Sequence, residues 1–168
     1  TYEELEEYSN RLAVWIAKNS QDRKRPVIVY GHKNPYMVVC FLACAKAGRS
    51  YVPQDICIPV SRVDETVLSV EPELTFVVEG DYQTEIGTEI GKDEIEEIVK
   101  QETNETDVLQ PLTKDEVWYI IFTSGSTGKP KGVEITRDCL SHYLDWSVQL
   151  GSTMKEKSGA HFMNQAPF

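Results

Sequence analysis

The first segment of the chain has an apolar face at helical spacing, formed by Leu5, Tyr8, Leu12, Trp15 and Ile16. This period predicts a helix that runs to about Asn19. Thr1 and Glu4 have the Thr-x-x-Glu spacing of a capping box, in which the two side chains satisfy free amides at a helix start. The chain therefore opens with a capped amphipathic helix.

Short runs of β-branched and apolar residues alternate with helical patterns along the rest of the chain. The runs predict strands at residues 26–31, 50–52, 74–78 and 117–122, with shorter extended segments at 133–135 and 162–164. Helices are predicted at residues 36–47, 61–70, 94–100 and 137–150. Because strands that alternate with helices are typical of an α/β fold, we expect a largely parallel sheet flanked by helices.

Several residues mark where these elements begin and end. Asn34 and Pro35 suit the N-cap and the first position of a helix, and Thr136 suits the N-cap of the last one. Gly48 can end a helix in the left-handed conformation. Residues 79–114 are acidic and poor in aromatic residues, so we interpret the charge run of helix 94–100 as a solvated face.

Composition and charge exclude some classes of function. The 168 residues, 40% of them hydrophobic, can bury the core of one domain. A net charge of −10, from 17 basic and 27 acidic residues, disfavours binding to nucleic acid or to anionic membranes. No apolar run approaches the roughly 18 residues that a membrane-spanning helix needs, and the acidic start is unlike a signal peptide. We therefore expect a cytoplasmic location without membrane insertion.

The cysteines and histidines suggest structural roles. Cys40 and Cys44 lie one helical turn apart in an apolar run, and no Cys-x-x-Cys pair occurs among the four cysteines at 40, 44, 57 and 139. We interpret all four as reduced thiols of a cytoplasmic core, and we predict no metal ligands. We interpret His32 and His142 as structural residues, while the role of His161 stays open.

The candidate chemistry lies in residues 123–132, directly after the predicted strand 117–122. Hydroxyl side chains can donate to phosphate oxygens, glycines let the backbone approach a ligand, and lysines supply positive charge in an acidic protein. Successive amides of such a turn can also surround an anion. The segment therefore predicts a phosphate-binding loop formed by Thr123, Ser124, Gly125, Ser126, Thr127, Gly128, Lys129 and Lys131, with Gly132 after it.

This loop differs from the P-loop of nucleotide hydrolases, in which Gly-Lys-Ser/Thr opens directly into a helix. Here Pro130 follows Lys129, and an extended segment is predicted after Gly132. We therefore expect hydroxyls, amides and lysines to bind phosphate, without a helix N-terminus. The alternative is a Ser/Gly-rich surface loop without a ligand, which the combination of hydroxyls, three glycines and Lys-Pro-Lys disfavours.

The loop resembles the signature phosphate loop of adenylate-forming enzymes. Residues 1–5 resemble the first core motif of that family, residues 45–53 the second, which typically reads Lys-Ala-Gly-x-x-Tyr-Val-Pro, and residues 164–168 the start of the fourth. The resemblance thus spans essentially the whole chain. Within the family, residues 29–32, 58–62, 119–122 and 164–168 are similar to the ligases that activate D-alanine for a carrier protein.

The resemblance implies that residues 1–168 are part of a large amino-terminal adenylation domain, begin after a short leader and lack the carboxy-terminal domain. It implies that ATP and Mg²⁺ convert D-alanine to D-alanyl-adenylate. The D-alanyl group would then pass to the phosphopantetheine thiol of a D-alanyl carrier protein, for D-alanylation of teichoic acid.

Among the loop residues, the resemblance implies a catalytic role for Lys131 and phosphate contacts for Thr123, Ser124 and Thr127. The ligands of Mg²⁺, ribose and the amino acid would lie outside this chain, so the fragment alone is expected to be inactive. Two alternatives stay open: an enzyme that adenylates another amino acid or an acyl group, and a nucleotide-binding module without catalysis.

Overall fold

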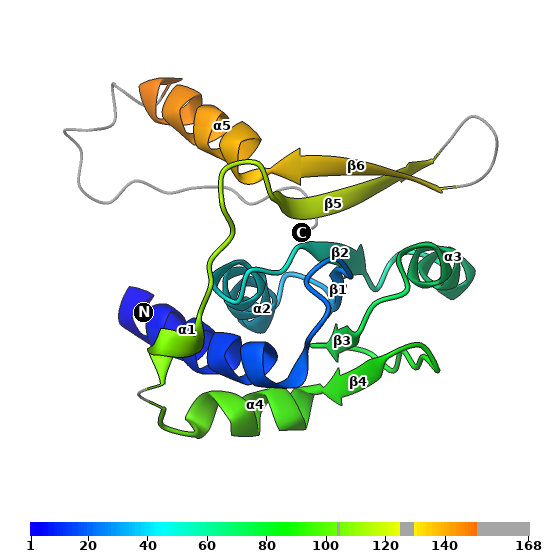
Figure 1. Ribbon diagram of the computed structural model, residues 1–168. Helices are drawn as coiled ribbons and strands as arrows, with labels where there is room; N and C mark the ends of the chain where they lie inside the picture. The colour runs from blue at the N-terminus through cyan, green and yellow to red at the C-terminus, as the bar shows by residue number, and fades with distance from the viewer. Residues whose placement is uncertain (104, 125–129, 151–168) are drawn as a thin grey trace.

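The computed structural model describes residues 1–103, 105–124 and 130–150 (Figure 1). Six strands form one sheet in the order β4-β3-β1-β2-β5-β6. Neighbouring strands run parallel from β4 to β5, and β6 pairs antiparallel with β5. The strands are β1 (Val27–Gly31), β2 (Tyr51–Asp55), β3 (Leu74–Val77), β4 (Thr88–Gly91), β5 (Val117–Ser124) and β6 (Pro130–Thr136).

Five α-helices accompany this sheet in the described part of the chain. They are α1 (Tyr2–Asn19), α2 (Pro35–Lys46), α3 (Val60–Val70), α4 (Lys92–Lys100) and α5 (Arg137–Leu150), with a short 3₁₀ helix η1 (Thr106–Val108). The predicted α/β fold with a largely parallel sheet is therefore confirmed.

Strand β1 separates two hydrophobic cores. Its alternate residues point to opposite faces, as the period of a strand requires. Val27 and Val29 join the core under α1, α2 and α4, whereas Ile28 and Tyr30 join the core under α3. Figure 1 shows these helices on the two sides of the sheet. Full burial of each aliphatic side chain contributes about 1.5–3 kcal/mol, so this central strand is a major source of stability.

Helix α1 has the capping box that the sequence predicts. The Thr1 hydroxyl accepts from the Glu4 amide, and the Glu4 carboxylate accepts from the Thr1 amine at 2.6 Å. Helix α4 packs on α1 and buries Ile95, Ile98 and Val99, while its acidic residues stay on the outer face. The predicted solvated charge run thus occupies one face of a helix whose other face belongs to the core.

Strand β2 extends past the predicted segment 50–52 and includes Pro53. Proline has no amide to donate, and within sheets it is mostly confined to places where a hydrogen bond to a neighbour is not needed. Here β2 pairs with β1 along its whole length but with β5 only at Tyr51 and Tyr119. The side of β2 that faces β5 is therefore free of ladder bonds at Pro53.

Two features differ from the sequence predictions. Strand β4 was not predicted, because its sequence Thr-Glu-Ile-Gly buries only Ile90 and lies at the sheet edge. Trp146 lies in the predicted helix 137–150 at a spacing typical of core-facing residues, but it keeps 55% of its surface exposed and contacts Tyr143 on the same helix. Helical spacing identifies a face of α5, but nothing in the described chain covers that face at Trp146.

Candidate functional site

The predicted phosphate loop lies at the end of the β5–β6 hairpin. Thr123 and Lys131 are opposite each other in the antiparallel register, and the Thr123 hydroxyl donates to the Lys131 carbonyl at 3.4 Å. Both residues are exposed, so a hydroxyl and an ammonium group are accessible at this end of the hairpin. Of the other predicted site residues, Ser124 ends β5, while Gly125, Ser126, Thr127, Gly128 and Lys129 lie outside the described residues.

The element after the loop is a strand. Pro130 and Lys131 open β6, which runs to Thr136, so the expectation of an extended segment is confirmed and the strand is longer than predicted. No helix N-terminus follows the loop, in agreement with the contrast to the P-loop. The expectation that phosphate is bound here by side chains and amides, without a helix N-terminus, stays a prediction.

Gly132 has a packing role in the hairpin. A β-carbon at this position would lie 3.0 Å from Ile120 Cγ2 and 3.2 Å from Phe122 Cζ. A larger residue would push these side chains away and disturb the register of β5 and β6 next to Lys131. The glycine thus supports the hairpin geometry because it leaves room for side chains of β5 beside β6.

Helix α5 begins directly after the hairpin. The Thr136 hydroxyl accepts from the Cys139 amide at 3.3 Å, which confirms the predicted N-cap. The Arg137 guanidinium donates to the Leu112 carbonyl at 2.7 Å and ties the helix start to the segment before β5. These bonds position the base of the hairpin.

A groove of about 470 Å³ lies at the carboxyl ends of β3 and β4. Its lining includes Glu79, Asp81 and Glu89 against a single cation, Lys92. This excess of negative charge disfavours a triphosphate. The hairpin end therefore stays the predicted place for phosphate.

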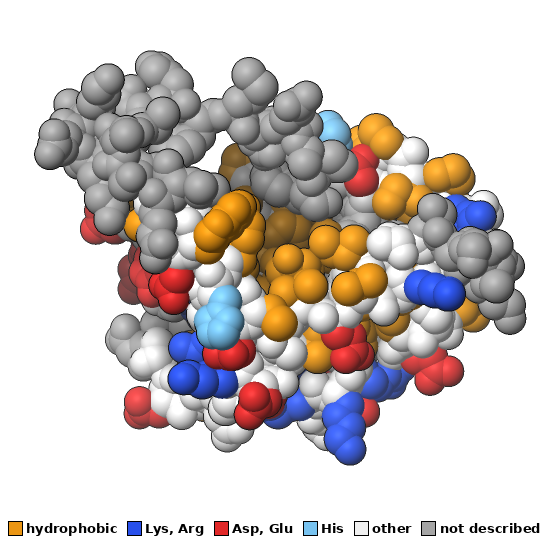
Figure 2. Space-filling model, turned by 90° about the horizontal axis from the view of Figure 1, so that it is seen from above, with side chains coloured by type: hydrophobic (Ala, Val, Ile, Leu, Met, Phe, Trp, Pro, Cys, Tyr) orange, Lys and Arg blue, Asp and Glu red, His pale blue; other side chains and the backbone are white. Residues whose placement is uncertain are grey.

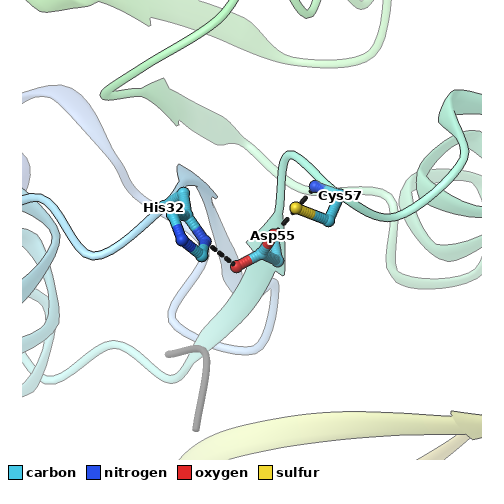
Figure 3. A group of neighbouring side chains, drawn as sticks. All are labelled: His32, Asp55 and Cys57. Atoms are coloured by element: carbon cyan, nitrogen blue, oxygen red, sulfur yellow. Dashed lines mark hydrogen bonds and ion pairs between the residues drawn. The ribbon is translucent and has the colours of Figure 1, made fainter. Parts of the chain in front are cut away.

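A second polar cluster occupies the carboxyl ends of β1 and β2 (Figure 3). His32 Nδ1 lies 2.6 Å from Asp55 Oδ2, while the Cys57 amide donates to Asp55 Oδ1 at 2.8 Å and its thiol also contacts this carboxylate. Burial raises the pKa of Asp55, but the hydrogen bonds from His32 and Cys57 outweigh it and hold the pKa below its ordinary value. The hydrogen bond to Asp55 raises the pKa of Cys57.

The cysteines divide into two groups. Cys40 and Cys44 are buried, as predicted, and burial raises the pKa of both thiols. Cys57 and Cys139 are exposed, so the prediction of four core thiols was wrong for these two. The sequence showed apolar context only around the first pair, and the cluster at Asp55 was missed because its members come from two strand ends. The position of His32 directly after the predicted strand 26–31 was the available signal.

Solved structures share this fold. O-succinylbenzoate coenzyme A synthetase (MenE) of Bacillus subtilis, in complex with AMP, superposes with a TM-score of 0.73 at 21% identity, covering 94% of this chain and 40% of that one. The N-terminal subdomain of Klebsiella oxytoca NpsA gives 0.67 at 25% identity, covering 82% and 34%. The fold therefore defines part of the amino-terminal domain of an adenylate-forming enzyme.

The family follows from the sequence as a whole. The family model described as AMP-binding enzyme matches residues 1–168, and the chain belongs to this family. It is 38% identical to a D-alanine–D-alanyl carrier protein ligase of Bacillus thuringiensis (strain Al Hakam) over 170 residues and 39% identical to one of Bacillus cereus (strain AH187) over 173. Each alignment covers 100% of this chain and 33% of the ligase, so the chain spans about a third of these relatives.

None of the helices in the described ranges is long and apolar enough to cross a membrane.

Proposed function

We propose that the protein containing this chain activates D-alanine with ATP and transfers it to a carrier protein. The observation that carries this proposal is the 38% identity, over the whole chain, to D-alanine–D-alanyl carrier protein ligases. The exposed hydroxyl and ammonium groups at the hairpin end support it, because they suit a polyphosphate.

The proposed reaction has two steps. A carboxylate oxygen of D-alanine attacks the α-phosphorus of ATP, the bond to the β-phosphate oxygen breaks, and pyrophosphate leaves. The phosphopantetheine thiol of the carrier protein then attacks the acyl carbon of D-alanyl-adenylate, so that a thioester forms and AMP and a proton are released. Such in-line attack at phosphorus requires mainly positioning and stabilisation of charge.

In this proposal the hairpin end restrains the phosphates that leave. Lys131 stabilises the negative charge that develops on pyrophosphate, and Thr123 donates a hydrogen bond to a phosphate oxygen. Ser124, Gly125, Ser126, Thr127, Gly128 and Lys129 complete the loop. We assign no residue of this chain to Mg²⁺, which commonly reaches such sites bound to substrate phosphates.

The test is amino-acid-dependent exchange of pyrophosphate into ATP, measured on the protein extended to its natural carboxy terminus. The panel contains D-alanine, L-alanine, glycine, D-serine and a short fatty acid. We expect exchange to be fastest with D-alanine, followed by thioester formation on a phosphopantetheinylated carrier protein.

Two other outcomes would contradict part or all of the proposed reaction. Faster exchange with another acid would contradict the substrate and keep adenylation. A folded protein that binds ATP but exchanges with no member of the panel would contradict catalysis and favour a nucleotide-binding module.

A further inference from the structure

The cluster at the carboxyl ends of β1 and β2 brings together three chemically different side chains. Gly31 and Asp55 are paired in the parallel register, so the residues that follow the two strands emerge side by side. His32 directly follows β1, Asp55 ends β2, and Cys57 lies two residues further on. One possible ligand atom from each residue lies within 4.8 Å of the other two.

We propose that His32, Asp55 and Cys57 bind a divalent transition-metal ion, with Zn²⁺ as the best match. Imidazole, carboxylate and thiolate are all ligands of Zn²⁺, and three protein ligands with one open position are typical of zinc sites that retain water. Mg²⁺ and Ca²⁺ prefer sites made of oxygen ligands, which this mixed set is not. This inference is independent of the proposed adenylation activity.

The distances suit an ion after a small adjustment. Tetrahedral Zn²⁺ with bonds of about 2.0–2.3 Å places its ligand atoms about 3.3–3.6 Å from one another. His32 Nδ1 and Asp55 Oδ2 are 2.6 Å apart, so this hydrogen bond would open by about 0.7 Å as the ion replaces the shared proton. Figure 3 shows the His32 and Cys57 side chains flanking Asp55, so the ion would enter between them.

The burial pattern gives the cluster a fixed centre and an accessible side. The Asp55 side chain is 7% exposed, and the Cys57 amide holds its second oxygen at 2.8 Å. The His32 side chain is 38% exposed and Cys57 is also exposed, which leaves a route for the ion and room for a water ligand. A held carboxylate between two accessible ligands lowers the cost of ordering the site.

The same cluster supports a role of Cys57 as an activated nucleophile less well than it supports a metal site. Nucleophilic cysteines are activated by a neighbouring base or cation that favours the thiolate. Here the thiol contacts the Asp55 carboxylate, which disfavours the thiolate and raises the pKa of Cys57, while His32 bonds to Asp55 instead. The arrangement of described residues therefore offers Cys57 no cation or imidazole that favours the thiolate.

The first test is titration with Zn²⁺ in competition with a chromophoric chelator. We expect one tight site per chain, and binding weakened by at least about tenfold in Cys57→Ser and in His32→Gln. Cys139→Ser is the matched control, since Cys139 is the other exposed cysteine and should leave the affinity unchanged. Circular dichroism verifies that each variant folds, and Asp55 is left intact because its carboxylate also holds the turn.

The second test identifies the sulfur ligand with Co²⁺ in place of Zn²⁺. We expect a sulfur-to-cobalt charge-transfer band that is present in Cys139→Ser and absent in Cys57→Ser. Zn²⁺ should also slow alkylation of Cys57 in the Cys139→Ser background. The lack of a tight site would overturn the proposal. So would equal Zn²⁺ affinity in Cys57→Ser and the unmodified protein, or a charge-transfer band that is lost in Cys139→Ser and kept in Cys57→Ser.

Discussion

At the residue scale, the hairpin end depends on the pairing of Thr123 with Lys131. Residues opposite each other in an antiparallel pair share one face of the sheet, so the side chains of Thr123 and Lys131 lie on the same face of the hairpin. The protein carries a net charge of −10, and a cation at this position changes the local field where a polyphosphate would bind. Lys131 therefore supplies a positive charge on the side of the hairpin where the Thr123 hydroxyl is also available.

Lys131→Ala in the complete protein should reduce pyrophosphate exchange by about 10²–10³-fold, the cost of a lost transition-state donor. Lys131 is exposed, so the free energy of unfolding should change by no more than about 0.5 kcal/mol. Lys114→Ala, which removes another exposed lysine, is the control and should leave exchange unchanged. Normal exchange in a folded Lys131→Ala protein would contradict the assigned role.

At the scale of the element, α2 begins beside the cluster at the end of β1. The Asn34 side chain accepts from the Tyr36 amide at 3.0 Å, and Pro35 occupies the first turn. The helix is apolar on much of its surface and buries Met37, Cys40 and Cys44. Tertiary packing stabilises its body, while the cap sets where it starts and how the chain leaves β1.

Asn34→Ala should lower the free energy of unfolding by about 1 kcal/mol, because one amide at the helix start loses its acceptor. Asn34→Asp is the matched variant: it keeps the acceptor and adds a negative charge that the helix N-terminus favours. Urea unfolding followed by circular dichroism measures both. An equal loss of stability in the two variants would show that the cap is not the cause.

At the scale of the whole molecule, apolar side chains gather on the face formed by β5, β6 and α5. Figure 2 shows hydrophobic side chains grouped on the upper face of the molecule. Among the described residues, ten large hydrophobic side chains are exposed, and six of them belong to these three elements: Ile121, Val133, Tyr143, Leu144, Trp146 and Val148. Apolar patches of this kind on isolated chains promote association.

Residues 1–168 alone should therefore self-associate, with a mass that rises with concentration in sedimentation velocity. Leu144→Glu and Trp146→Glu should shift the chain toward the monomer, because each places a charge within the apolar face. Leu68→Glu is the control, since Leu68 is 64% exposed on α3, which is not one of these three elements. A monomer at every concentration, or equal effects of all three variants, would contradict this expectation.

Local sequence signals were sufficient where the determinant lies within one segment. The capping box of α1, the strand β1 and the Thr136 cap were predicted because periodicity and capping act over a few residues. The strand after the candidate phosphate loop was predicted from residues 133–135, while the loop itself was proposed from composition and resemblance. The contacts of loop residues 125–129 stay a prediction.

The sequence by itself determined the family, the alternation of strands with helices and the candidate phosphate loop, because these depend on residue order and short-range spacing. Only the tertiary structure decided that β4 forms, that Pro53 is tolerated inside β2 and that Cys57 meets His32 at Asp55. Each of these depends on which strands become neighbours and in what register. Pairing of strands distant in sequence is a property of the packed sheet, and spacing along the chain does not encode it locally.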